Sequence, residues 1–577
     1  MLTDATLTFI ALGAIFAYSF YAVLVAGQLS LGQAGFASLA AFTSVTLGPN
    51  PKEFGEVPGL LIAIAIGMVV GAIAAVVLGL PTMHLRGVFL AIATLAFAEA
   101  VRILILNMEW TGGAQGMSVP KVLTPAMAWI ALAIVAYWFT RQGRSRYGRA
   151  LEAIREDELA ARAMGIDVGR HRLSAFVTAG AVAGLYGVLW AYYVRLIAPE
   201  DFSFATAIDG LVTAVVGGST MFLGPLLGSA FFTLIPEVQR AMGVEAGWVR
   251  PFISSALLLV VILFLPGGLA SFIPRRVHMP KTHGSDLGSD RAGLRTRSHP
   301  SAGEPVATLQ GLSKEYGGVH AVQSVDLELR SGEVVGLIGP NGAGKTTLVN
   351  MISGLIPPSS GHATVLGMDV GRTPVHRVAR AGVSRTFQHS KLFNRLSALE
   401  NVLVGGHLVS KPTFLRRLVF LPSARRDEAE ALEHAARCLE RVGLGDLAAS
   451  RASALSYGDQ RRLEIARALA SDPSLLILDE PAAGMNHVEA TRLSELIRSL
   501  ASDGLTILLI EHNVGMVLGT CSRIIVLNFG KVIATGTPDE IANNPEVIEA
   551  YLGSEHSDDS TTGRGAQAAD HAEGAPS

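Results

Sequence analysis

The segment 339–347 is the part of the sequence whose residue types and spacing most directly specify chemistry. It follows an apolar run, 334–338, and precedes helix-forming residues, so it lies where a strand turns into a helix. Glycines let successive backbone N–H groups point at phosphate oxygens, and the helix start adds its positive dipole. Lys345 is placed to reach the β- and γ-phosphates, and the Thr346 hydroxyl is placed to ligate Mg²⁺. This P-loop pattern predicts a nucleoside triphosphate site. Its predicted ATP-binding residues are Gly339, Pro340, Asn341, Gly342, Ala343, Gly344, Lys345, Thr346 and Thr347.

Two adjacent carboxylates follow a second apolar run, 475–478. We predict that Asp479 holds Mg²⁺ and that Glu480 polarises the attacking water. A strand that ends in two solvated acids is the alternative. A further apolar run, 507–510, ends at Glu511 and His512, and behind such a carboxylate pair His512 becomes a candidate γ-phosphate contact. These residues predict catalysis of phosphoryl transfer rather than nucleotide binding alone.

Composition divides the chain of 577 residues into two unlike parts. Half of it is hydrophobic and 16% is charged, with a mean hydropathy of +0.41. Charges are sparse before Arg141 and frequent from 305 to 553, which predicts a membrane part and a soluble α/β part. The net charge of −2 indicates no class of partner. Two isolated cysteines, both in the soluble part, favour a reducing compartment. The N-terminus lacks a basic n-region before its apolar run, so we do not expect a cleaved signal peptide.

Long apolar stretches predict an all-α polytopic bundle of about eight spans. The single spans are expected at about 7–27, 30–47, 59–80, 87–107, 124–140, 173–194 and 252–273. The Arg-rich loop 141–172 should be cytoplasmic, which places the N-terminus outside. For the soluble part to end inside, region 205–240 has to enter and return as two short segments, broken at Gly217–Thr220 and Gly224.

Three further features of the membrane part have two interpretations each. The glycine-rich stretches around Gly35 and Gly218 either line a substrate path as parts of an internal repeat or allow close helix packing. Glu99 and Arg102 form an ion pair one turn apart or serve a functional role. The charged segment 149–164 is expected to form a short surface helix, ended by a glycine, that transmits movement of the soluble part to the membrane part. A solvated connector is the alternative.

Composition also sets the domain boundaries. We expect a transmembrane domain at 1–273, a flexible linker at 274–304, an ATP-binding domain at 305–553 and a disordered tail at 554–577.

The segment 455–469 resembles the signature sequence of ABC ATPases and the helix behind it, in a Ser-Tyr-Gly variant. The resemblance covers about 305–553 and implies an α/β P-loop ABC ATPase domain that works as a pair. It implies that Gln388 senses Mg²⁺, that Tyr316 stacks on adenine and that His512 is the switch histidine. Asn486 stands where many such ATPases have Asp, so its role across the dimer is open. The signature residues that would serve the partner's ATP are Ser456, Tyr457, Gly458, Asp459 and Gln460.

Narrower motifs resemble branched-chain amino acid ABC importers. Segments 385–388, 480–484 and 549–553 are similar to the first ATP-binding subunit of these systems. Segments 85–97, 111–113 and 148–155 are similar to a permease subunit. The resemblance implies a natural fusion of the two subunits, with the coupling helix inside 149–164. Its implied coupling residues are Arg149, Glu152, Arg155, Glu156 and Asp157.

We therefore predict an ATP-driven importer subunit for branched-chain or related hydrophobic amino acids, using ATP and Mg²⁺. It would be a multi-pass protein of the inner or plasma membrane with its ATPase domain in the cytoplasm. The implied partners are a second permease and a second ATPase domain, as a homodimer or a heterodimer, and an extracytoplasmic binding protein. The alternatives are a same-family importer of urea, short amides or aromatic acids, an ABC exporter, or a membrane-anchored ATPase regulator. No residue of the membrane part specifies the ligand.

Overall fold

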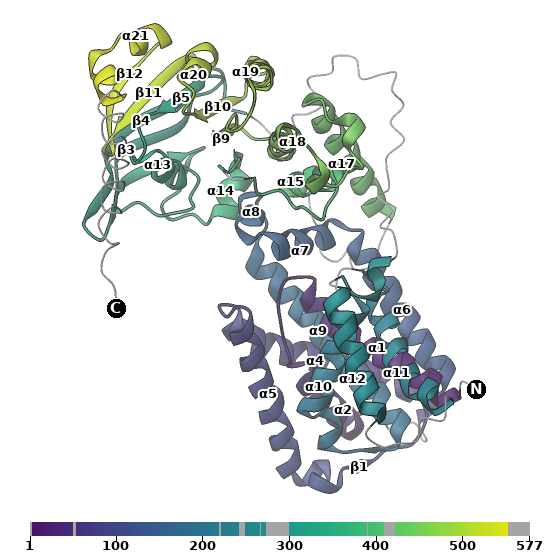
Figure 1. Ribbon diagram of the computed structural model, residues 1–577. Helices are drawn as coiled ribbons and strands as arrows, with labels where there is room; N and C mark the ends of the chain where they lie inside the picture. Colours follow the sequence, from purple (N-terminus) through teal and green to yellow (C-terminus); the bar gives the residue numbers. More distant parts are fainter. Residues whose placement is uncertain are drawn as a thin grey trace, which may run out of the picture. The chain divides into compact units, whose positions relative to one another are not determined.

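The computed structural model describes residues 3–49, 54–218, 221–241, 249–265, 267–272, 299–388, 390–408 and 422–551. The chain forms two compact units (Figure 1). The first comprises Met1–Glu158 and Asp167–Arg276 and is called the helical unit. The second comprises Leu159–Ile166 and Val277–Ser577 and is called the α/β unit.

The helices of the helical unit follow the predicted spans closely. They are α1 (Asp4–Leu24), α2 (Gln33–Leu47), α4 (Glu56–Thr82), α5 (Val88–Asn107), α6 (Pro125–Gly143), α7 (Arg146–Glu156), α9 (Val168–Val194), α10 (Phe204–Gly217), α11 (Gly224–Ala241) and α12 (Val249–Phe264). Among the described residues, α1, α4, α5 and α9 are long and apolar enough to cross a membrane. The last predicted span, 252–273, is shorter than expected, because α12 ends at Phe264 and a 3₁₀ turn, Leu269–Phe272, follows it.

Helix α9 packs along α4 through glycines spaced four residues apart on both helices. Gly67 and Gly71 of α4 face Gly184 and Gly180 of α9. A Cβ atom on Gly71 would overlap the carbonyl oxygen of Gly180, and one on Gly180 would overlap the carbonyl oxygen of Gly71. The two backbones therefore touch directly, which is how small residues drive association of helices in a membrane.

We expect Gly71→Ala to destabilise the helical unit by about 1–3 kcal/mol, because the added methyl group has to push two backbones apart. Thermal unfolding of the detergent-solubilised full chain measures this change. Gly143→Ala is the matched control, since a Cβ atom there meets no atom within 4 Å. Equal unfolding temperatures for the two variants would contradict the close approach.

The region 205–240 contains two short helices, as predicted. Helix α10 ends at Gly217 and α11 begins at Gly224. The two helices pack against each other, and a Cβ atom on Gly217 would overlap the carbonyl oxygen of Gly224. Gly218 has a φ of +117°, a conformation that favours glycine. The break thus depends on glycine at this turn, while Ser219 and Thr220, which the prediction also included, lie outside the described residues.

Glu99 and Arg102 form the predicted ion pair on α5. Arg102 donates from Nε to both carboxylate oxygens of Glu99, at 3.0 and 3.1 Å. The structure adds a third member that was not predicted, because Arg102 Nη1 also lies 2.5 Å from Oε1 of Glu200, in the 3₁₀ turn Pro199–Phe202. The guanidinium therefore joins α5 to the segment between α9 and α10, and each of the three charges has an opposite charge beside it.

The charged loop differs from the single helix predicted at 149–164. It forms α7 (Arg146–Glu156) and α8 (Glu158–Ala163), with Asp157 in an extended conformation between them. Three consecutive carboxylates, at 156–158, meet at this break, and like charges in one helical turn repel one another. Glu158 instead lies 3.1 Å from both Arg86 and Arg172, so tertiary ion pairs favour the interruption.

The α/β unit contains two sheets and the helices around them. Its strands are β3 (Pro305–Tyr316), β4 (Val319–Arg330), β5 (Val334–Ile338), β6 (Ser360–Val365), β7 (Met368–Asp369), β8 (Val383–Arg385), β9 (Leu475–Asp479), β10 (Thr506–Ile510), β11 (Arg523–Asn528) and β12 (Lys531–Gly536). Its helices are α13 (Lys345–Ile352), α14 (Val375–Ala381), α15 (Ala398–Gly405), α17 (Pro422–Arg441), α18 (Tyr457–Leu469), α19 (His487–Ser502), α20 (Val514–Thr520) and α21 (Pro538–Ala542).

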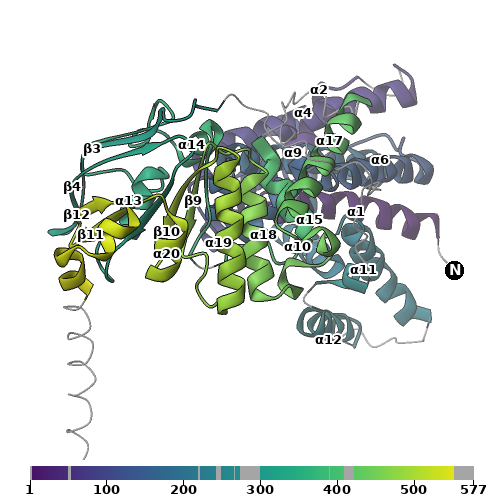
Figure 2. The same ribbon diagram turned by 90° about the horizontal axis from the view of Figure 1, so that it is seen from above.

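The central sheet has the order β12-β11-β5-β10-β9-β8 and is parallel except for β12. Its strands are apolar on both faces, as parallel strands covered on both sides require. Leu475 and Ile477 of β9 enter one core, shared with α13 and the antiparallel sheet β4-β3-β6-β7. Leu476 and Leu478 enter the other core, with α15, α17 and α18, which pack together (Figure 2).

Both cysteines, Cys438 and Cys521, are buried in the α/β unit as free thiols. Part of the predicted linker is ordered: the ring of His299 lies 2.9 Å from Ser474 Oγ and 3.1 Å from Asp472 Oδ1. The chain is therefore held against the α/β unit from His299, a few residues before Pro305. Residues 273–298 and 552–577 lie outside the described residues.

Candidate nucleotide site

The P-loop connects β5 to α13 at the carboxyl edge of the central sheet, where α/β folds bind ligands. Gly339 and Gly344 have φ values of +151° and +95°, and a Cβ atom on either would overlap a backbone oxygen of a neighbouring strand. Lys345 Nζ curls back and donates to the carbonyl oxygens of Gly339, at 2.6 Å, and Pro340, at 2.9 Å. The ammonium group is thus held over the loop, where phosphate oxygens can replace carbonyl oxygens as its acceptors.

Burial lowers the pKa of Lys345, and the nearby carboxylates of Glu480 and Asp479 oppose that shift. The electrostatic contact places the lysine and both carboxylates in one site, although they are more than 130 positions apart in the sequence.

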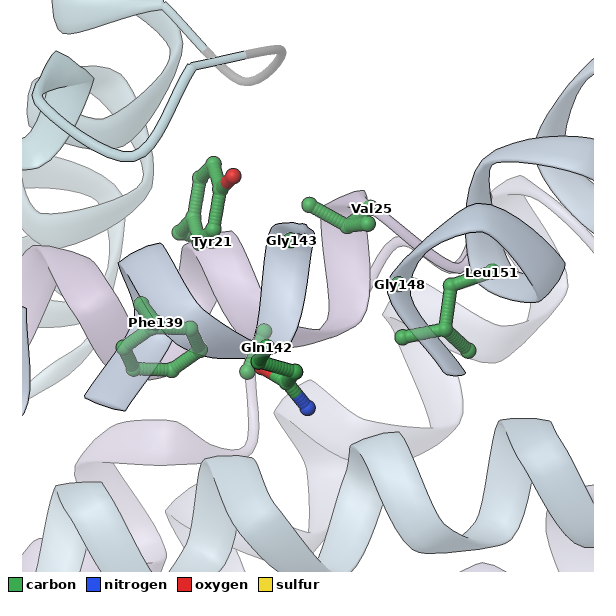
Figure 3. A pocket seen from close by; sticks show the side chains of 8 residues that line it. Tyr21, Val25, Phe139, Gln142, Gly143, Gly148 and Leu151 are labelled. Atoms are coloured by element: carbon green, nitrogen blue, oxygen red, sulfur yellow. The ribbon is translucent and has the colours of Figure 1, made fainter. Parts of the chain in front are cut away.

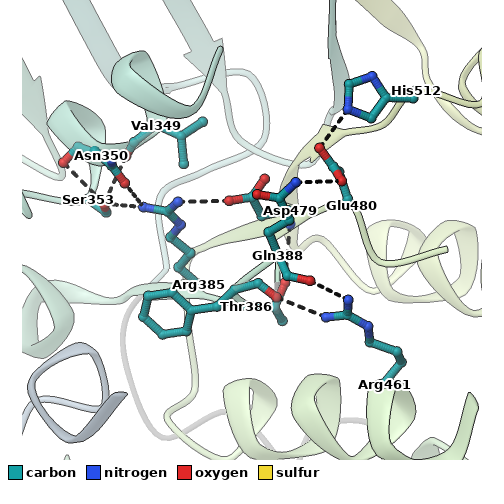
Figure 4. Close-up of polar contacts among 11 residues, drawn as sticks. Val349, Asn350, Ser353, Arg385, Thr386, Gln388, Arg461, Asp479, Glu480 and His512 are labelled. Atoms are coloured by element: carbon teal, nitrogen blue, oxygen red, sulfur yellow. Dashed lines mark hydrogen bonds and ion pairs between the residues drawn. The ribbon is translucent and has the colours of Figure 1, made fainter. Parts of the chain in front are cut away.

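Two other predicted residues contact the carboxylate of Glu480 (Figure 4). His512 Nε2 lies 2.6 Å from its Oε1, and Gln388 Nε2 donates to its Oε2 at 3.0 Å. Glu480 is also one of the few non-glycine residues with a left-handed backbone, with a φ of +49°. Such strain persists where surrounding structure fixes it, and here the Glu480 N–H donates to the carbonyl oxygen of Ile510 at 2.8 Å. The geometry suits a general base whose carboxylate is oriented from both sides.

Glu511, at the end of β10, is buried beside this site. Burial raises its pKa, and three backbone N–H groups oppose the shift. Two of these are the N–H of Ala482, which donates to Oε1 at 2.7 Å, and the N–H of His512, at 3.2 Å from Oε2. The side chain therefore joins the segment after β9 to the segment that carries His512, and its role is to shape the site.

The signature residues begin α18, where Ser456 is the N-cap and accepts from the N–H of Asp459 at 3.2 Å. Tyr457 is exposed, while its hydroxyl lies 2.9 Å from Arg461 NH2. Arg461 in turn donates to the carbonyl oxygens of Phe387, at 2.9 Å, and Gln388. The signature segment is thereby connected to the Gln388 segment, although Ser456 and its neighbours do not enter the Glu480 cluster. Ser456 and Tyr457 are exposed at the start of α18, whereas Gly458 is buried.

The residues predicted to contact adenine and Mg²⁺, Tyr316 and Thr346, both lie at the surface of the α/β unit. Tyr316, at the end of β3, is half exposed and has the Lys314 ammonium 5.2 Å from its ring centre. Thr346 is exposed in the first turn of α13. Asn486 is the N-cap of α19 and accepts from the N–H of Glu489 at 2.9 Å, which Asp could do as well. The departure from Asp therefore preserves the helix start.

The residues present fit ATP and Mg²⁺. The P-loop supplies a backbone cradle with an ammonium group above it, which matches a triphosphate. Among the described residues, no three His, Cys, Asp or Glu side chains cluster to form a metal site of their own. Mg²⁺ commonly needs only one or two carboxylates together with phosphate oxygens, and the oxygens of Thr346 and Asp479 provide such hard ligands.

A pocket in the helical unit lies where α1, α6 and α7 meet (Figure 3). It is lined by Tyr21, Ala22, Val25, Phe139, Gln142, Gly143, Gly148 and Leu151. None of these side chains is charged, and Tyr21 and Gln142 are its polar members.

Sequence reasoning missed two arginines of the nucleotide site. Arg385 pairs with Asp479, and Arg461 binds the backbone of the Gln388 segment. Both lie within the segments 385–388 and 455–469 that carry the family resemblance, but neither was assigned a role from the sequence. A basic residue at the end of a short buried strand, as at Val383–Arg385, was the available signal for the first.

Three family models match the chain. Residues 2–265 match the branched-chain amino acid transport system permease component, 322–483 the ABC transporter family, and 531–557 the branched-chain amino acid ATP-binding cassette transporter family. The permease match covers the helical unit together with Leu159–Ile166, and the ABC transporter match lies within the α/β unit.

Relatives of the α/β unit include ATP-binding proteins of import and export systems. The branched-chain amino acid transport ATP-binding protein LivG of Salmonella typhimurium is 49% identical, covering 43% of this chain and 98% of LivG. BraF of Pseudomonas aeruginosa, of the same description, is 45% identical with the same coverage. The lipopolysaccharide export ATP-binding protein LptB of Haemophilus influenzae is 36% identical, covering 43% of this chain and 97% of LptB.

These matches confirm the predicted combination of a helical permease and an ABC ATPase. The protein binds ATP, couples its hydrolysis to transport, and is embedded in a membrane with its ATPase domain in the cytoplasm. It works in an assembly with permease and ATPase partners. The chain therefore belongs to the ABC transporter family, as a permease component and an ATP-binding component of the branched-chain amino acid transport type joined in one polypeptide.

Proposed function

We propose that the protein imports branched-chain or closely related hydrophobic amino acids delivered by an extracytoplasmic binding protein. The observation that supports this most strongly is that two independent parts of one chain, 2–265 and 531–557, match families of the same transport type. LptB shows that an ATP-binding component alone does not fix the direction of transport. The permease match therefore carries the assignment of import.

The proposed work of the ATP site falls to a small set of side chains. Lys345 and the P-loop N–H groups hold the β- and γ-phosphates, and Thr346, Gln388 and Asp479 hold Mg²⁺. The metal supplies charge neutralisation on the phosphates when bound. Glu480 Oε2 or Oε1 accepts a proton from the attacking water, while His512 and Gln388 keep the carboxylate in place.

Hydrolysis is proposed to reach the membrane part through the 141–172 loop. The loop itself supports this, because it carries two short charged helices, α7 and α8, next to long apolar helices. The charged residues that carry the proposal are Arg149, Glu152, Arg155, Glu156 and Asp157. Ser456 and the rest of the signature are proposed to contact the ATP of a partner ATPase domain, whether that partner is a second copy or a different subunit.

Binding by the accessory protein and uptake by the whole system test the substrate. We expect thermal-shift screening of the binding protein encoded nearby to give stabilisation by leucine, isoleucine or valine. Cells that express the full system should then accumulate radiolabelled leucine, and unlabelled valine should compete. Stabilisation by urea, short amides or aromatic acids instead would reassign the substrate, and ATP-dependent efflux from cells would reject import.

A further inference from the structure

Arg385 occupies a buried position between three parts of the nucleotide site. It is the last residue of β8 and lies three positions before Gln388. Its side chain is only 5% exposed, and that of Asp479 only 3%. From NH2 it donates to Asp479 Oδ2 at 2.8 Å, and from NH1 to Asn350 Oδ1 on α13 at 2.5 Å (Figure 4). One guanidinium therefore joins β8, the end of β9 and the P-loop helix.

Asp479 is fixed from the same segment in a second way. Its backbone N–H donates to Thr386 Oγ1 at 3.2 Å. The Thr386 N–H in turn donates to the carbonyl oxygen of Ile477 at 2.9 Å. Arg385 donates to Oδ2 of Asp479, so the other carboxylate oxygen, Oδ1, is the one left to ligate a metal ion. Residues 385 and 386 thus set both the backbone and the side-chain direction of Asp479.

Stability alone gives a poor reason for this arrangement. A buried ion pair loses the hydration of two charges, and apolar residues of similar volume often stabilise a fold as well or better. The planar guanidinium has a property that a hydrophobic side chain or a lysine lacks, because it donates in two fixed directions at once. Here those directions lead to the P-loop helix and to the carboxylate at the end of β9.

We propose that Arg385 is a positioning residue for the metal site: it holds Asp479 Oδ2 and thereby directs Oδ1 towards nucleotide-bound Mg²⁺. The proposal rests on the proposed role of Asp479 as a metal-holding residue. Residues that orient metal ligands typically change metal affinity by about 10–100-fold when they are substituted. Arg385 also precedes the Gln388 segment, so the metal carboxylate and Gln388 are oriented by the same short stretch of chain.

The test measures metal dependence rather than turnover. The full chain is prepared in detergent with Glu480→Gln to suppress hydrolysis, and binding of a fluorescent ATP analogue is titrated with MgCl₂. We expect Arg385→Lys to raise the Mg²⁺ concentration for half-maximal enhancement of binding by about tenfold. Binding in EDTA should stay unchanged, because Lys345 and the P-loop are intact.

Arg523→Lys is the matched control, since Arg523 NH2 makes a similar ion pair with Glu333 Oε1 at 2.7 Å on another strand. An unchanged Mg²⁺ requirement in Arg385→Lys, with the control also unchanged, would overturn the positioning role. A lower unfolding temperature of Arg385→Lys with an unchanged Mg²⁺ requirement would assign Arg385 a purely structural role. That result would likewise overturn the proposal. ATP binding that ignores Mg²⁺ in the chain carrying Arg385 would instead reject the metal role of Asp479, and the proposal with it.

Asn350→Ala keeps the proposal testable if Arg385→Lys does not fold. It removes the acceptor on α13 and leaves the Arg385–Asp479 pair in place, while NH1 keeps Ser353 Oγ at 3.2 Å. We expect a smaller shift in Mg²⁺ requirement, of about threefold, since only one of the two fixed directions is lost. No shift in this variant would contradict the role of the P-loop helix in orienting Asp479.

Discussion

Glu480→Gln should lower ATP hydrolysis and coupled uptake by about 10²–10⁴-fold while leaving ATP binding intact. The amide has nearly the same size and can still accept from Gln388 Nε2, which lies 3.0 Å from the carboxylate. It cannot accept a proton from water, so the loss falls on the chemical step. Phosphate release from the purified assembly and binding of a fluorescent ATP analogue measure the two properties separately.

Glu495→Gln is the control for this substitution, because Glu495 is exposed on α19 and lies in the same unit. It should hydrolyse ATP at the normal rate. Turnover by Glu480→Gln within a few-fold of normal would reject Glu480 as the base and direct attention to His512, which lies 2.6 Å away.

Lys345→Met should weaken ATP binding by about 10–100-fold, because a hydrogen bond to a charged group contributes about 1.5–3 kcal/mol. Met preserves the length of the side chain and removes the ammonium that now donates to Gly339 and Pro340. Uptake should fall at least as far as binding, since bound nucleotide drives transport. Equilibrium binding of the fluorescent analogue, with and without Mg²⁺, gives the affinity.

The exposed Lys531 of β12 provides the comparison, and Lys531→Met should bind ATP normally. A Lys345→Met chain with unchanged affinity would mean that the backbone cradle of the P-loop is sufficient for binding. The two substitutions in the site then separate its functions: Lys345 for holding the triphosphate and Glu480 for breaking it.

The sequence predicted the parts of the ATP site that are encoded locally. The P-loop and the Asp479–Glu480 pair follow from strand, turn and helix patterns within a few residues. His512 followed from its place after the apolar run 507–510, Gln388 came from resemblance, and the structure places both against Glu480. The Arg385–Asp479 pair joins residues 94 positions apart, so no local pattern could reveal it.

The membrane part shows the same division between local and distant effects. Hydropathy and glycines located the helices and the break between α10 and α11. The pair of Glu99 and Arg102 was visible because it is one turn apart, whereas Glu200 is 98 positions from Arg102. The interruption of 149–164 at Asp157 was missed, because helix propensity favours continuity while ion pairs of Glu158 with distant arginines decide the outcome.

The two buried thiols have a practical consequence for studying this transporter. Burial raises the pKa of both Cys438 and Cys521 to about 12, so each stays in the unreactive protonated form at neutral pH. The chain has no other cysteine. A single cysteine introduced at an exposed site can therefore carry a spin label or a fluorophore in the otherwise unaltered protein, and the movements of the two units can be followed by spectroscopy during turnover.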